Sequence, residues 1–108
     1  MDEIKDILNQ LLDFRDKRDW KQFHTPENLA KSISIEANEL LENYQWGSEH
    51  ADEVNVKEEV ADIFSYLLLF CDALRIDILK ETKNKIRKNA KKYPVEKAFG
   101  NSKKYTKL

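Results

Sequence analysis

The chain has little of what a β-sheet protein needs. Of its 108 residues only two are glycine and two are proline, whereas 36% are charged. Tight turns depend on glycine and proline, so their scarcity argues against a sheet with many turns and favours helices joined by short loops. Because 108 residues are too few for two cores, the sequence predicts one all-α domain, residues 1–108.

Disulfides, membrane spans and a leader segment are also not indicated. Cys71 is the one cysteine and stands in an apolar run, so we expect a buried thiol. No apolar run approaches the roughly 18 residues that a membrane span needs. The N-terminal segment alternates charged and apolar residues, unlike a signal peptide. We therefore expect a soluble, cytoplasmic protein that does not bind membranes.

The charges almost cancel over the whole chain but are unevenly distributed. Residues 1–79 hold 18 acidic and 8 basic residues, a net charge of −10, while residues 80–108 hold 2 acidic and 11 basic residues, a net charge of +9. Two solvated faces would explain this pattern. Alternatively, the acidic part holds cations and the basic end meets a polyanion. Stable nucleic-acid binding is not expected, because the acidic part would repel phosphate backbones.

Apolar residues at helical spacing predict four helices in a core of about residues 2–93. The predicted helices span residues 2–17, residues 26–45, about residues 52–74, and the stretch between Asp77 and Pro94. Thr25 is a good N-cap for the second helix, and Gly47 follows its expected end. Residues 94–108 are predicted to be a basic tail.

Acidic residues border the apolar faces of the second and third helices. At about 100° per residue, Glu36 and Glu39 lie together at the edge of one apolar face, while Glu42 is turned toward solvent. Glu59 and Asp62 occupy the corresponding edge of the third helix. If the two helices are antiparallel neighbours, both pairs meet in one partly buried patch.

Carboxylates in such a patch repel one another and lose hydration unless they are protonated or paired with cations. A hard divalent ion such as Mg²⁺ removes this penalty and completes its shell with water and substrate phosphates. The alternative is that both pairs are ordinary surface acids, and spacing alone leaves this open. A di-iron centre is disfavoured, because neither His24 nor His50 follows a glutamate at E-x-x-H spacing.

Five segments contain these acids together with aromatic and basic residues. They are RDWKQFH (18–24), NLAKSISIEANELLENYQW (28–46), EEVADIFSYLL (58–68), KNKIRKNAKKYP (83–94) and GNSKKYT (100–106). In these segments the chain resembles the MazG-like superfamily of all-α nucleoside triphosphate pyrophosphohydrolases, and most of all its dCTP pyrophosphatase branch. The resemblance implies a four-helix bundle of that type.

The resemblance also implies an activity: hydrolysis of a (deoxy)nucleoside triphosphate between its α and β phosphorus atoms. The products are a monophosphate and pyrophosphate, the cofactor is Mg²⁺ or Mn²⁺, and dCTP or modified dCTP is the expected substrate, in sanitation of the nucleotide pool. Glu36, Glu39, Glu59 and Asp62 would hold the metal ions, and Glu39 would also orient or deprotonate the attacking water. This chemistry requires positioning and electrostatics but no covalent nucleophile.

Further residues would bind the substrate by the same resemblance. They are Trp20, Phe23 and Trp46 for the base, Tyr66 near the sugar, and Lys85, Asn89, Lys92, Tyr93, Lys104 and Tyr105 for the phosphates. Packing in the core is the alternative for the aromatic residues, and disorder is the alternative for the tail. His24 is expected to belong to the start of the second helix. Leu11 stands where some relatives carry histidine, which affects base selection.

The apolar arc of the third helix is wider than one small bundle needs, so we expect at least a homodimer. The resemblance independently implies a homodimer or a homotetramer. Two alternatives to dCTP hydrolysis stay open at this point. One is the same chemistry on dUTP or on mixed non-standard triphosphates, and the other is a non-catalytic helical interaction module.

Overall fold

The computed structural model describes residues 2–108, and the regular elements among them are all helical. The α-helices are α1 (Glu3–Lys17), α2 (Pro26–Glu42), α3 (Glu53–Leu74), α4 (Ile78–Lys92) and the short α5 (Val95–Ala98). Single 3₁₀ turns span Lys21–Phe23, Ser48–His50 and Tyr105–Lys107. The all-α prediction is confirmed. None of the helices in this part of the chain is long and apolar enough to cross a membrane.

Side-chain caps start the four long helices. The capping residues are Asp2, Thr25, Asp52 and Asp77, each of which accepts a hydrogen bond from a backbone N–H in the first turn. Such a cap satisfies a donor that has no partner inside the helix. The predicted starts of the second helix after Thr25 and of the fourth helix after Asp77 are therefore confirmed.

The predicted end of the second helix was wrong. Helix α2 ends at Glu42, three residues early, because the Asn43 side chain turns toward the start of α3. Its amide donates to Oδ1 of Asn55 at 2.8 Å and its Oδ1 accepts from the Asp52 N–H at 3.2 Å. Residues 94–108, which were predicted to be a basic tail, include regular structure. They contain α5 and the last 3₁₀ turn, since Pro94 ends α4 and is followed by a new helical turn.

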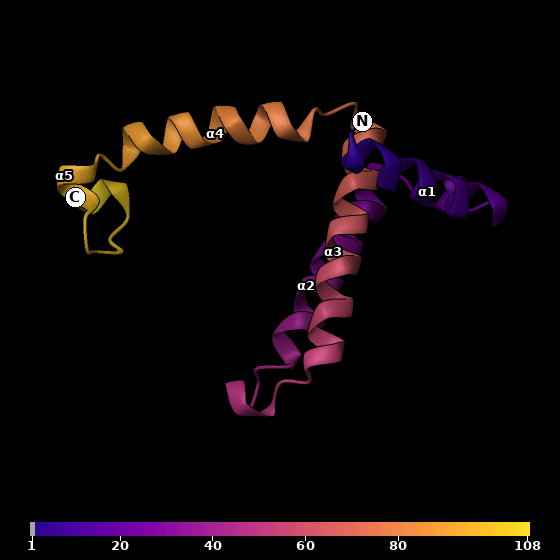
Figure 1. Ribbon diagram of the computed structural model, residues 1–108, viewed down its shortest axis with the longest axis horizontal. Helices are drawn as coiled ribbons and strands as arrows, with labels where there is room; N and C mark the ends of the chain where they lie inside the picture. Colours follow the sequence, from indigo (N-terminus) through magenta and orange to yellow (C-terminus); the bar gives the residue numbers. More distant parts are fainter. Residues whose placement is uncertain (1) are drawn as a thin grey trace. The chain divides into compact units, whose positions relative to one another are not determined.

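The chain divides into two compact units, one ending at Arg75 and one that runs from Ile76 to Leu108. In the first unit α2 and α3 run side by side as an antiparallel hairpin joined by residues 43–52, and α1 packs against α3 (Figure 1). Helices α1, α2 and α3 belong to the first unit and α4 and α5 to the second, so the packing of four helices in one bundle stays a prediction. Helix α4 has only three large apolar residues among 15, so it contributes little to a core.

The core of the first unit lies where α2 and α3 meet. Its buried apolar residues are Leu29, Leu68, Leu69 and Cys71. Burial raises the pKa of the Cys71 thiol, so the group stays protonated and packs as a small apolar side chain. The predicted buried thiol is confirmed. This packing fixes α2 and α3 against each other, and with them the acids that each helix carries.

Candidate functional site

Three acids meet between α2 and α3. Each of Glu36, Glu59 and Asp62 offers a carboxylate oxygen, and these oxygens all lie within 4.8 Å of one another. Glu59 is only 8% exposed, Glu36 is half-buried and Asp62 is open to solvent. Among residues 2–108, no lysine or arginine forms an ion pair with any of the three. We call these three residues the acid cluster.

The acid cluster is electrostatically strained without a cation. The pKa of Glu36 is raised from 4.5 to about 8, first by a hydrogen bond shared with the Glu59 carboxyl, then by burial, and then by Glu39 and the charge of Asp62. In the structure of residues 2–108, Oε2 of Glu36 and Oε2 of Glu59 are buried and have no hydrogen-bond partner, and a proton on Glu36 would supply one. Buried oxygens of this kind need a proton or a cation. The donor set fits a hard divalent ion, which prefers oxygen ligands.

Glu39, the fourth acid predicted from the sequence, borders the acid cluster. Glu39 is not one of the three residues whose carboxylate oxygens lie within 4.8 Å of one another, although it helps to raise the pKa of Glu36. Glu39 and Glu59 line a hollow of about 450 Å³ at the far end of the hairpin, together with Glu42, Asn43, Trp46, His50 and Asn55. Trp46 is 76% exposed there, so one of its faces is available for contact.

A second cavity, of about 230 Å³, adjoins the acid cluster through Asp62. Helices α1 and α3 and the loop after α1 line it. Its lining residues are Leu11, Phe14, Arg15, Trp20, His24, Asp62, Ser65, Tyr66 and Leu69. We call it the aromatic cavity. Phe23, by contrast, lies outside this lining and is largely exposed.

The loop after α1 builds one wall of the aromatic cavity. Asp19 adopts a left-handed backbone conformation with φ of 54°, which aspartate tolerates better than most residues. The turn lets the Trp20 N–H donate to the Arg15 carbonyl at 3.1 Å. Trp20 then packs edge-to-face on Phe14, with ring centroids 5.9 Å apart. The centroid of the His24 ring lies 6.4 Å from that of Trp20. The rings of Phe14, Trp20 and His24 thus meet at interplanar angles of 75° and 55° and form an aromatic wall of the cavity that Asp62 also lines.

Tyr66 connects the aromatic cavity with the acid cluster. It is half-buried, and its pKa is raised first by burial and then by the charges of Glu36, Asp62 and Glu39. Its hydroxyl therefore stays protonated at neutral pH and can donate a hydrogen bond. A neutral donor beside an anionic patch is suited to a hydroxyl or phosphate oxygen of a ligand.

The sequence analysis missed Arg15 as a residue of this cavity and assigned His24 only to the start of a helix. Burial, followed by the charge of Arg15, lowers the pKa of His24, and its Nδ1 is buried without a hydrogen-bond partner. A signal for Arg15 was available in the sequence. It lies four residues after Leu11, so both side chains share one face of α1.

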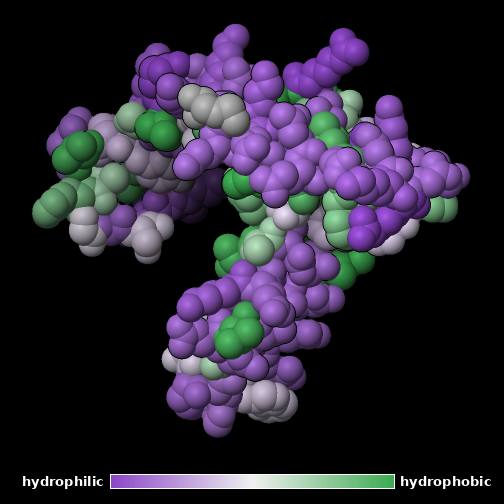
Figure 2. Space-filling model, turned by 45° about the vertical axis from the view of Figure 1, so that its right-hand side comes forward, coloured by the Kyte–Doolittle hydropathy of each residue, from purple (hydrophilic) through white to green (hydrophobic). Residues whose placement is uncertain are grey.

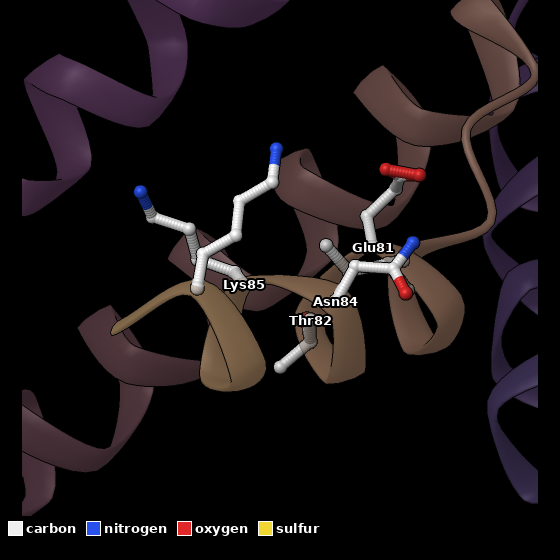
Figure 3. A pocket seen from close by; sticks show the side chains of 6 residues that line it. Glu81, Thr82, Asn84 and Lys85 are labelled. Carbon is white, nitrogen blue, oxygen red and sulfur yellow. The ribbon is translucent and has the colours of Figure 1, made fainter. Parts of the chain in front are cut away.

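The predicted basic residues lie in the second unit. Tyr93 and Tyr105 pack edge-to-face with ring centroids 6.0 Å apart, and Nζ of Lys92 lies 5.0 Å from the centre of the Tyr105 ring. Lys85 projects from α4 beside a hollow that it lines with Ile78, Glu81, Thr82, Asn84 and Lys88 (Figure 3). Asn89 and Lys104 are exposed. Their roles toward a triphosphate stay predictions.

Comparisons with known proteins place the chain in a family. The MazG-like family matches residues 31–108. Human dCTP pyrophosphatase 1 is 32% identical over 114 residues, covering 97% of this chain and 67% of that protein, and the bovine dCTP pyrophosphatase 1 is also 32% identical, with 68% of its length covered. The crystal structure of a pyrophosphatase from Archaeoglobus fulgidus matches with a TM-score of 0.83 at 42% identity, over 87% of this chain and 94% of that one. The chain therefore belongs to the MazG-like family, as its sequence motifs predicted.

Proposed function

We propose that this chain hydrolyses a deoxynucleoside triphosphate between the α and β phosphorus atoms with Mg²⁺ as cofactor, and that dCTP or a modified dCTP is preferred. The coarser assignment, a nucleotide pyrophosphohydrolase, follows from membership of the family and from relatives named for dCTP pyrophosphatase and pyrophosphatase activity. One observation supports the full proposal most strongly: the acid cluster, with two buried oxygens lacking partners, adjoins the aromatic cavity.

Glu36, Glu59 and Asp62 would hold the divalent ion, and Glu39 would complete the set. When bound, Mg²⁺ or Mn²⁺ supplies Lewis-acid polarisation of the phosphoryl oxygens and lowers the pKa of water. The chain itself keeps four carboxylates close enough for their charges to oppose ionisation, so that the cluster favours cations strongly. Glu39, half-buried beside Glu36, would orient the attacking water and accept its proton.

The aromatic cavity would receive the base. At about 230 Å³ it is smaller than the roughly 300 Å³ at which pockets for drug-sized ligands begin, so it suits a base and part of a sugar better than a whole nucleotide. Trp20 would stack on the base, and Tyr66 would donate to the sugar. Trp46 and Phe23 would contribute from outside the cavity, since both rings are exposed.

Basic residues of the second unit would bind phosphate. Lys85, Asn89 and Lys92 share one face of α4, and residues 80–108 carry a net charge of +9. Tyr93, Lys104 and Tyr105 would add contacts from the chain that follows α4. Lysine binds phosphate as a point charge, so such a face does not need a preformed bidentate geometry.

A homodimer or homotetramer is part of the proposal. Large apolar side chains are exposed on both units: Val60, Phe64 and Leu74 on α3, and Ile86 and Phe99 in the second unit. Figure 2 shows apolar side chains at the surface between the polar ones. Exposed apolar surface can be covered by a partner, and a second copy of the chain would cover these side chains here.

Pyrophosphate release from dCTP, dUTP, dTTP, dATP and dGTP, each with Mg²⁺, tests the proposal. We expect deoxynucleoside monophosphate and pyrophosphate as the products, with the highest kcat/KM for dCTP. A preference for dUTP, or equal turnover of several triphosphates, would overturn the choice of substrate but leave the reaction intact. Turnover of none would overturn the reaction and indicate a helical interaction module.

A further inference from the structure

One charged side chain of the aromatic cavity has no part in the mechanism above. Arg15 lines the cavity from the last turn of α1, and only 13% of its side chain is exposed. Arginine is seldom withdrawn from water to this extent unless it is paired. Its position inside a cavity for a base therefore calls for an explanation.

The one acidic partner of Arg15 among the described residues holds only one edge of its guanidinium group. Oδ1 of Asp16 accepts from Nε at 2.8 Å and lies 2.7 Å from Nη2. A guanidinium has five N–H donors in a rigid fork. Asp16 thus fixes the group through its Nε–Nη2 edge, and the Nη1–Nη2 end keeps donors for a second partner.

The other polar residues of the cavity do not take up that end. The Ser65 hydroxyl donates a hydrogen bond to the Ala61 carbonyl at 2.8 Å instead. Among residues 2–108, Arg15 forms no ion pair with Asp62. His24 is kept neutral by burial and by the neighbouring guanidinium. The remaining lining near Arg15 includes apolar Leu11 and Phe14. Arg15 therefore lines a cavity whose one carboxylate among the lining residues is Asp62 of the acid cluster.

We propose that Arg15 is a specificity-determining residue, whose Nη1–Nη2 end donates two hydrogen bonds to a base with two neighbouring acceptors. Among the pyrimidines this is the N3–O2 edge of cytosine. Uracil and thymine carry a hydrogen on N3, so each offers only one acceptor at that edge, and the second N–H of Arg15 would meet a donor. The inference rests on the proposed function and assigns to Arg15 the choice among bases.

Replacement of Arg15 tests the inference through a ratio of rates. We expect both Arg15→Gln and Arg15→Lys to lower the ratio of kcat/KM for dCTP to that for dUTP by roughly 10- to 100-fold. This is the discrimination between bases that a bidentate pair of hydrogen bonds usually provides. Lysine should not rescue the ratio, because its ammonium cannot form the paired hydrogen bonds. A ratio measured on one preparation is independent of the fraction of active enzyme, so partial loss of folding does not affect it.

Lys17→Gln is the matched control. Lys17 lies on the same helix, but its exposed side chain pairs with Asp13 outside the cavity. The dCTP to dUTP ratio should not change in this variant. If Arg15→Gln does not fold, the ratio measured for Arg15→Lys tests the inference by itself, because lysine keeps the positive charge and an aliphatic stem.

Two results would overturn the inference, and they are distinguishable. In the first, the wild type is active and the Arg15 variants keep its dCTP to dUTP ratio, even if they lose activity equally with all triphosphates. This result would show that Arg15 only supports the fold. A wild type that hydrolyses no triphosphate would overturn the proposed function, and this inference with it.

Discussion

Glu59→Gln is expected to reduce Mg²⁺-dependent hydrolysis by more than about 100-fold, since even residues that only support metal ligands typically cost 10- to 100-fold when they are replaced. Glutamine keeps the size of the side chain and one carbonyl oxygen, but it loses the negative charge. Glu59 is the most buried member of the acid cluster, and its Oε2 has no other partner. Pyrophosphate release measures the loss, and circular dichroism should show the same helix content as in the wild type.

The neighbouring Glu58 provides the control for this experiment. It is exposed on the same turn of α3 and lies outside the acid cluster. Glu58→Gln should therefore retain wild-type activity. Near-wild-type hydrolysis by Glu59→Gln would remove that carboxylate from the site.

The metal-free protein is expected to become less stable as the pH rises from about 4.5 to about 8. Glu36 has a pKa of about 8 in the folded chain against a reference value of 4.5, so between these values the folded state binds more protons than the unfolded state. Stability then falls with rising pH, because the Glu36 carboxyl is forced to ionise beside Glu59. A change of about 1 kcal/mol moves the Tm of a domain of this size by roughly 4–8 °C, so thermal melts in chelator at several pH values should resolve it.

Two further melts test whether Glu36 is the cause. Glu36→Gln should flatten the dependence of Tm on pH over this window, since the amide does not titrate. Excess Mg²⁺ should raise the wild-type Tm most at the alkaline end, where the ionised cluster binds the cation and the folded state gains that binding free energy. A wild-type Tm that does not change with pH in chelator would contradict the assignment of strain to the acid cluster.

The sequence predicted those features that depend on periodicity along one helix. The starts of α2 and α4 could be read from Thr25 and Asp77, because a cap acts within three residues of its own position. Glu36, Glu59 and Asp62 could be placed at the rim of an apolar face, because helical spacing fixes the side on which a residue lies. The antiparallel hairpin then brought them together, as predicted.

Other features depend on contacts between residues distant in sequence, which periodicity does not report. Helix α2 ends at Glu42 because Asn43 bonds to Asn55, 12 positions away. The cavity role of Arg15 depends on where the loop after α1 turns, and that turn is set by the left-handed backbone of Asp19. Charged side chains are by default assigned to solvent, so a largely buried arginine is recognised only when the lining of the cavity is known.

The claim at the centre of this account is that the carboxylates of Glu36, Glu59 and Asp62 hold a divalent ion. Anomalous X-ray scattering from crystals grown with Mn²⁺ tests it most directly. We expect a strong anomalous peak between the three side chains, with oxygen ligands at roughly 2 Å, as for a hard divalent ion. An absence of such a peak, with the three carboxylates instead paired to lysines or turned into solvent, would contradict the claim.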